Sequence, residues 1–204
     1  MNIAFINPPF LPKYSRGSRS PAVTKSGTVY YPIWLALAAG YSERFGHKII
    51  LIDAPAEPIT KEETIKRLAD FNPDLAVIET STGSISNDVR FAAGLKEIFP
   101  AIFICLVGNH VTACDKDTLA GNNMINSVAR NEYEETIVDL ANRLEKKESL
   151  ESVLSLTWRK GNNIFRNESR LPLQNLDEMP FASEIFKRFV DPGNYFFSAG
   201  RFPQ

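Results

Sequence analysis

The sequence has little cysteine, no long apolar run and almost no net charge, and each shortage excludes a class of protein. Cys105 and Cys114 are the only cysteines in 204 residues, so we expect no disulfide scaffold and a reducing, cytoplasmic location. No apolar run approaches the ~20 residues of a spanning helix, and residues 1–6 lack the basic region of a signal peptide, so we expect no membrane association. The formal net charge of −1 provides no field that would recruit nucleic acid, so no nucleic-acid partner is expected.

What the sequence does contain is an alternation of short apolar runs and helical patterns that lasts until about residue 146. A hydrophobic content of 44% with 23% charged residues is typical of a folded globular chain. The apolar runs are rich in Ile, Val, Leu, Phe and Ala, which is typical of parallel strands that are covered on both faces. The predicted strands are Asn2–Ile6, Lys48–Ile52, Leu75–Thr80, Ile102–Val107 and Ile125–Ala129.

Helical patterns fill the gaps between these strands, and several carry end signals. Pro32 suits a first helical turn, and Gly46 is a natural stop for the same helix. Thr60 and Glu63 form a capping box at the start of the next helix. Five β/α alternations with short connections predict a doubly wound α/β fold. We therefore expect a five-stranded parallel sheet flanked by helices, in the 2-1-3-4-5 order of flavodoxin-like folds.

The pattern changes after Lys147. Residues 154–158 and 164–166, separated by a Lys-Gly-Asn-Asn turn, predict a β-hairpin. From Leu171 onward, prolines punctuate a segment that we expect to be mostly irregular. The predicted organisation is therefore an α/β domain over residues 1–147, a hairpin extension over residues 148–170, and a linker over residues 171–204.

The candidate site follows from the predicted sheet, because ligands of open α/β sheets bind outside the carboxyl ends of the strands. Taken singly, the four loops at these ends are ordinary turns or helix caps. Together they line one edge of the sheet with small and mostly uncharged groups, which could accept a large flat ligand with amide edges. The candidate binding residues are Asn7, Pro8, Pro9, Ser81, Thr82, Gly83, Ser84, Gly108, Asn109, His110, Arg130, Asn131 and Glu132.

Other chemically capable residues are assigned to the fold. His47 follows a helix-stopping glycine and is expected to begin a strand. Cys105 lies inside an apolar strand, as expected for a core residue. Asp53 and Glu79 are carboxylates at strand ends, and neither has a sequence neighbour that would make it a general base.

The order and spacing of these segments resemble a known family. Tyr31–Gly40 contains a Pro-x-x-Leu-Ala helix, and Gly46-His47 and Ile52-Asp53-Ala54 follow it. Val107–Thr112 is similar to a Gly-Gly-x-His-x-Thr stretch, and Arg130–Glu134 to an Arg-Gly-Glu-x-Glu turn. With Asn7-Pro8-Pro9 in the first loop, these motifs resemble the N-terminal cobalamin-binding domain of radical S-adenosylmethionine enzymes, in the group of class B methyltransferases and magnesium-protoporphyrin ester cyclases.

The resemblance implies that the four loops bind cobalamin. The Asp-x-His-x-x-Gly motif that supplies a lower cobalt ligand in other cobalamin domains is absent, so we expect base-off cobalamin with no protein ligand on cobalt. The resemblance also implies a parent protein with a downstream radical S-adenosylmethionine barrel, a [4Fe–4S] cluster, S-adenosylmethionine and a small-molecule substrate. The cluster's Cys-x-x-x-Cys-x-x-Cys motif is absent from these residues, so the chain alone is not expected to be catalytic.

Several related folds fit the sequence less well. A flavodoxin needs a phosphate-binding Thr/Ser/Gly loop after its first strand, where this sequence has Asn-Pro-Pro. A receiver domain needs an aspartate after the third strand, where Ser81 and Thr82 stand. A dinucleotide-binding domain needs a Gly-x-Gly-x-x-Gly run, which does not occur. A non-catalytic docking domain that has lost the cofactor remains an alternative.

Overall fold

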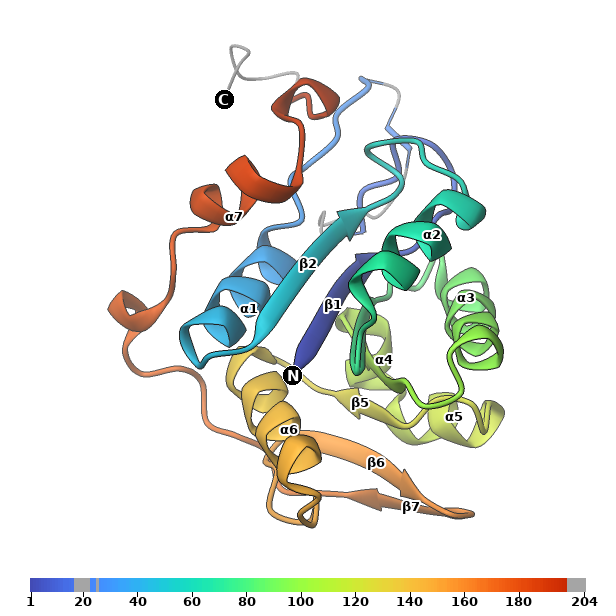
Figure 1. Ribbon diagram of the computed structural model, residues 1–204, viewed down its shortest axis with the longest axis vertical. Coiled ribbons are helices and arrows are strands. Elements are labelled where there is room, and N and C mark those ends of the chain that lie inside the picture. Colours follow the sequence, from blue (N-terminus) through green and yellow to red (C-terminus); the bar gives the residue numbers. More distant parts are fainter. Residues whose placement is uncertain (17–22, 25, 198–204) are drawn as a thin grey trace.

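The computed structural model describes residues 1–16, 23, 24 and 26–197, and a parallel sheet runs through its centre (Figure 1). Its five parallel strands lie in the order β2-β1-β3-β4-β5, which is the predicted flavodoxin-like order. The alternation of apolar runs therefore predicted both the strands and their type. The strands are β1 (Asn2–Asn7), β2 (Lys48–Asp53), β3 (Leu75–Glu79), β4 (Phe103–Val107) and β5 (Ser127–Ala129).

The sheet has seven strands, which corrects the prediction of five. The expected hairpin consists of β6 (Leu156–Lys160) and β7 (Asn163–Arg166), and it does not stand apart from the sheet. β6 pairs antiparallel with β5, with Ser127 opposite Trp158, and β7 continues the sheet beyond β6. Apolar Leu156 and Trp158 alternate with Thr157, so one face of β6 joins the core beneath the helices.

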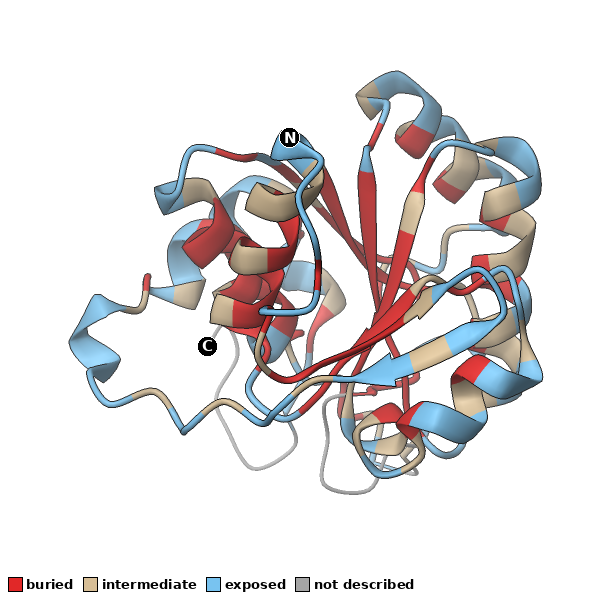
Figure 2. Ribbon diagram, turned by 90° about the horizontal axis from the view of Figure 1, so that it is seen from below, coloured by how far each residue is buried: buried red, intermediate tan, exposed pale blue. Residues whose placement is uncertain are grey.

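Helices cover both faces of the sheet, and each face has its own apolar core (Figures 1 and 2). One face packs against α1 (Ile33–Arg44), α6 (Glu134–Lys146) and α7 (Ala182–Phe189). The other face packs against α2 (Lys61–Phe71), α3 (Ile85–Ile98), α4 (Asn109–Ala113) and α5 (Asp115–Gly121). Burial on both faces explains why the central strands are almost continuously apolar.

Capping residues in the sequence predicted the start of one helix correctly, and the helical periodicity missed two short helices. Thr60 caps α2 as predicted, since the Glu63 amide donates to Thr60 Oγ1 at 3.2 Å. α3 begins at Ile85, and Asp88 in its first turn pairs with Arg16. α4 and α5 were not predicted, since neither is long enough to show a clear helical period.

The C-terminal segment contains more regular structure than the sequence predicted. α7 packs on α1 beside Gly40, where an added Cβ would lie 2.7 Å from Pro180 Cγ. An ion pair of 2.6 Å joins Arg188 to Glu43 across the same contact. Beyond α7, Phe196 pairs with Val29 in an antiparallel bridge. The expectation of a mostly irregular segment is therefore wrong for residues 182–197, while the domain boundaries at 147 and 170 remain predictions.

Within the described residues, no helix combines the length and the apolar composition needed to cross a bilayer. The same residues contain no cluster of three or more His, Cys, Asp or Glu side chains arranged to hold a metal ion.

Candidate functional site

A pocket of about 660 Å³ lies at the carboxyl ends of β3, β4 and β5, and we call it the rim pocket. The N-terminal ends of α1 and α6 form its other walls, through Trp34 and residues 133–134. Pockets of this size are typical of small-molecule and cofactor sites, and the place is the one expected for an open α/β sheet. Seven of the candidate residues line it, namely Ser81, Thr82, Gly83, Gly108, Asn109, Asn131 and Glu132.

Gly108 allows the loops after β3 and β4 to approach each other closely. Its φ of 110° is unfavourable for other residues, and an added Cβ would lie 2.3 Å from the Thr80 carbonyl oxygen. Asn131 adopts a left-handed φ of 60°, which asparagine tolerates. The Asn131 amide donates to Thr112 Oγ1 at 3.0 Å, which fixes the next loop against α4.

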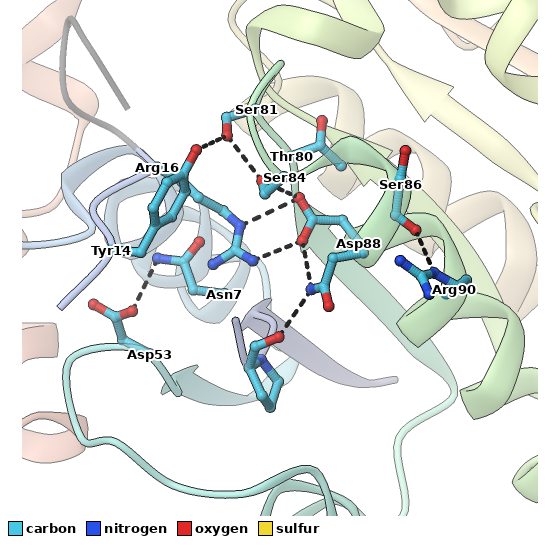
Figure 3. Close-up of polar contacts among 12 residues, drawn as sticks. Asn7, Tyr14, Arg16, Asp53, Thr80, Ser81, Ser84, Ser86, Asp88 and Arg90 are labelled. Atoms are coloured by element: carbon cyan, nitrogen blue, oxygen red, sulfur yellow. Dashed lines mark hydrogen bonds and ion pairs between the residues drawn. The ribbon is translucent and has the colours of Figure 1, made fainter. Parts of the chain in front are cut away.

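A buried polar network fixes the loop after β3 to α3 (Figure 3). Arg16 Nη2 lies 2.6 Å from Asp88 Oδ1, and both side chains are fully buried. Ser84 donates to the same carboxylate at 2.5 Å, and Ser81 and Tyr14 continue the chain of hydroxyls at 2.8 and 2.9 Å. A buried pair of this kind needs hydrogen bonds to its charged atoms. Here both Asp88 oxygens are satisfied, whereas Arg16 Nη1 has no partner in the described structure. Ser84 therefore supports the pocket wall without lining it.

Asn7 takes part in a second polar contact, at the carboxyl ends of β1 and β2. Its side chain donates to Asp53 Oδ1 at 3.2 Å, and Tyr195 donates to Asp53 Oδ2 at 2.9 Å. Burial raises the pKa of Asp53 to about 6, although the two hydrogen bonds and the charge of Arg16 act in the opposite direction. Asn7 thus connects β1 and β2 beneath the C-terminal segment, outside the rim pocket.

Four more of the candidate residues also lie outside the rim pocket. The Pro9 carbonyl accepts a hydrogen bond from Asn87 at 2.8 Å, and Pro8 precedes it in the same turn. His110 lines a separate hollow of about 390 Å³, and its Nδ1 lies 3.3 Å from Thr82 Oγ1.

Arg130, the last of the four, is fully buried and bound to the fold. It donates to Thr157 Oγ1 at 2.6 Å and to the Asn167 carbonyl at 2.7 Å, and it forms an ion pair with Asp115 at 3.3 Å. These contacts join β5 to β6 and α5. The structure therefore gives Arg130 a role in holding the sheet together.

Glu79 and Tyr133 are wall residues that the sequence did not single out as binding residues. Both side chains are buried, and neither Glu79 Oε2 nor Tyr133 Oη has a hydrogen-bond partner in the described structure. Burial raises the pKa of Glu79 to about 8, with a lowering contribution from Arg16 and raising contributions from Asp53 and Asp88. Burial likewise raises the pKa of Tyr133 well above its usual value.

The other wall residues that sequence reasoning missed are Arg16, Trp34, Thr80, Thr112 and Glu134. Trp34 gave a usable signal, because it is a large aromatic residue in the first turn of α1, two residues after Pro32. Arg16 gave no signal, since only the fold brings the first loop to α3.

The fold and the pocket define a doubly wound α/β domain with its ligand site at the strand ends, and comparison with known proteins agrees. Residues 19–141 match the B12 binding domain family. This match covers more than half of the 204 residues, so the chain belongs to that family.

Two curated relatives show the wider similarity. The chain is 32% identical over 158 residues to an uncharacterized methyltransferase, PH0819, of Pyrococcus horikoshii, covering 77% of this chain and 34% of the relative. It is 27% identical over 203 residues to the anaerobic magnesium-protoporphyrin IX monomethyl ester cyclase of Synechocystis sp., covering 98% of this chain and 38% of the relative. The chain thus spans about a third of the length of these relatives.

Solved structures share the fold at low sequence identity. The cobalamin-dependent S-adenosylmethionine radical enzyme OxsB, with aqua-cobalamin and S-adenosylmethionine bound, superposes with a TM-score of 0.74 at 14% identity, over 91% of this chain and 24% of OxsB. The radical S-adenosylmethionine methyltransferase TsrM of Kitasatospora setae, with tryptophan and an S-adenosylmethionine analogue bound, gives 0.67 at 12% identity, over 84% and 30%. The predicted resemblance to cobalamin-dependent radical enzymes is confirmed.

Proposed function

We propose that this chain binds cobalamin in the rim pocket and is the cofactor-binding part of a radical S-adenosylmethionine enzyme. The observation that carries the proposal is a pocket of about 660 Å³, at the strand ends of a B12 binding domain, lined by small polar loops. Membership of the family supports the ligand, and the position of the pocket supports the site.

The residues present fit this cofactor in two respects. Gly108 has no Cβ, so the loops after β3 and β4 close against each other at Thr80, and both loops line the pocket. Glu79 Oε2, Tyr133 Oη and Arg16 Nη1 are buried polar atoms of the pocket wall without partners among the described residues, as expected where a ligand supplies them.

Each part of the wall has a distinct task in this proposal. Thr82, Asn109 and Asn131 offer hydroxyl and amide groups, which suit the neutral carboxamides at the edge of a corrin ring. Trp34 provides an apolar wall that keeps water from one side of the pocket. Cobalamin, when bound, supplies a cobalt centre that can carry a methyl group for transfer.

We further infer that the cofactor binds base-off with no protein nitrogen on cobalt. The sequence contains two histidines, His47 and His110. His47 lies at the start of β2, the opposite end of the sheet, and His110 faces a separate hollow. Neither lines the rim pocket, which supports this coordination state.

For the parent protein, we propose a cytoplasmic enzyme with a downstream barrel that holds a [4Fe–4S] cluster and S-adenosylmethionine. The relatives that support this include a methyltransferase and an ester cyclase, so the reaction we propose is methyl transfer, ring formation or another rearrangement of a small molecule. The chain itself supplies the cobalamin site and is not catalytic alone.

Reconstitution with hydroxocobalamin, followed by desalting, tests the binding proposal. The chain should retain stoichiometric corrin absorbance, whereas a docking domain that has lost the cofactor retains none. Gly83→Trp should abolish retention, because Gly83 is an exposed residue of the pocket wall. Ala120→Trp, on the exposed side of α5, is the matched control and should retain the cofactor. Equal retention by the Gly83 variant would place the site elsewhere.

A further inference from the structure

The wall of the rim pocket contains three buried polar groups with an unsatisfied atom in the described structure, Arg16, Glu79 and Tyr133, and this inference concerns the last two. Glu79 ends β3 and Tyr133 precedes α6, and each is only 4% exposed. Both line the pocket, and Glu79 Oε2 and Tyr133 Oη have no partner in the described structure. Buried polar atoms are rarely left unsatisfied in folded proteins, so this pair is prepared for a ligand.

The surroundings of Glu79 keep its carboxyl group uncharged at neutral pH. Arg16 lowers the pKa of Glu79, but it already forms a 2.6 Å ion pair with Asp88, and its effect is smaller than that of burial. Asp53 on β2 and Asp88 on α3 add negative charge, and Tyr133 on the α6 side is neutral. Burial therefore decides the outcome and raises the pKa of Glu79 to about 8.

An uncharged carboxyl group has a specific binding preference. Its O–H donates and its carbonyl oxygen accepts, side by side, which matches the carbonyl and N–H of a primary carboxamide. An ionised carboxylate has acceptors only and cannot bond to the carbonyl of that carboxamide. The Tyr133 hydroxyl, which lines the same pocket, can donate one further hydrogen bond to the ligand.

We propose that the uncharged Glu79 carboxyl, together with the Tyr133 hydroxyl, recognises a carboxamide of the ligand in the rim pocket. The inference rests on the proposed function, because cobalamin carries a fringe of such carboxamides. It predicts that binding depends on a proton held by Glu79.

Equilibrium dialysis with methylcobalamin at pH 7 and pH 9 tests this dependence, since the cobalt-bound methyl group does not titrate in that range. Affinity of the unaltered chain should fall about tenfold between pH 7 and pH 9, as the protonated fraction of Glu79 falls. Glu79→Gln keeps a hydrogen-bond donor and an acceptor, so its affinity for methylcobalamin at pH 7 should equal that of the unaltered chain. Its affinity should not change between pH 7 and pH 9. Tyr133→Phe should weaken binding several-fold at both pH values. Glu97→Gln, an exposed acid on α3, should behave like the parent.

The outcomes separate the two proposals. Absence of binding by the unaltered chain at both pH values would overturn the proposed function and this inference with it. If the unaltered chain binds methylcobalamin and Glu79→Gln shows the same pH dependence as the unaltered chain, the inference alone is overturned. A second measurement does not require the variant to fold. Infrared spectra of the unaltered chain at pH 7 should show a protonated carboxylic acid band that shifts when methylcobalamin is added. An unshifted or absent band would equally overturn the inference.

Discussion

Glu79→Gln should stabilise the ligand-free chain, and the gain should grow with pH. In the folded state the pKa of Glu79 is raised from 4.5 to about 8, so the folded chain binds more protons at this site than the unfolded chain does between these values. Stability from an acid with a raised pKa therefore falls as pH rises through this window. The glutamine variant carries no ionisable group at this position and escapes the loss.

The magnitude follows from the size of the window. One pKa unit corresponds to about 1.4 kcal/mol, so the loss in the parent is about 1 kcal/mol at pH 5 and about 3 kcal/mol at pH 7. The free energy of unfolding of Glu79→Gln minus that of the parent should thus increase by about 2 kcal/mol between pH 5 and pH 7. Any constant difference between glutamine and neutral glutamate cancels in this comparison.

Urea unfolding of both proteins at pH 5 and pH 7, without cobalamin, measures this difference. Glu97→Gln is the control, and its difference from the parent should not change with pH, because Glu97 is exposed on α3. A Glu79→Gln difference that is constant between the two pH values would refute the reasoning, because Glu79 would then ionise normally in the fold.

The remaining predictions concern the backbone, the sheet and the cofactor. Gly108→Ala should lower the free energy of unfolding, measured in urea, by at least ~2 kcal/mol, because Gly108 has a positive φ and a blocked Cβ position. Gly121→Ala is the control and should cost less than ~1 kcal/mol, because the space around Gly121 is open. Arg130→Met should destabilise by ~2 kcal/mol, since Thr157 Oγ1 and the Asn167 carbonyl lose a buried donor while Asp115 keeps Arg166. A change below ~1 kcal/mol would contradict the role of Arg130 in the sheet. His110→Ala should weaken cobalamin binding tenfold at most and leave the absorbance maxima of bound cob(II)alamin unchanged, and the electron paramagnetic resonance spectrum of that state should show no nitrogen splitting from an axial ligand. Splitting in the parent that disappears in His110→Ala would show that this histidine binds cobalt.

The sequence predicted the sheet well because its signal is local. Continuous apolar runs can be interpreted without knowing their neighbours, and they gave β1 to β5 as parallel strands. Their order cannot be read from the runs and was taken from flavodoxin-like folds. The end of the chain was less predictable. Tyr195 donates to Asp53, 142 residues earlier, and such a contact leaves no local pattern. The hairpin was predicted, but its pairing with β5 depends on the edge that the other strands leave open.

The candidate site was predictable to the level of loops and not to the level of side chains. The rule that ligands bind at strand ends identified the loops after β3, β4 and β5, and residues of all three line the rim pocket. Glu79 was assigned to the fold, because a single acid at the end of an apolar strand has no neighbour in the sequence that marks it. Its significance depends on Tyr133 and on the pairing of Arg16 with Asp88, which only the folded chain brings together.

The most direct test of the central claim is a crystal structure of the chain grown with hydroxocobalamin. The account predicts corrin density in the rim pocket, against Trp34 and the Gly108 loop, with no protein nitrogen on cobalt. Corrin density in the hollow beside His110, or a histidine bound to cobalt, would contradict it.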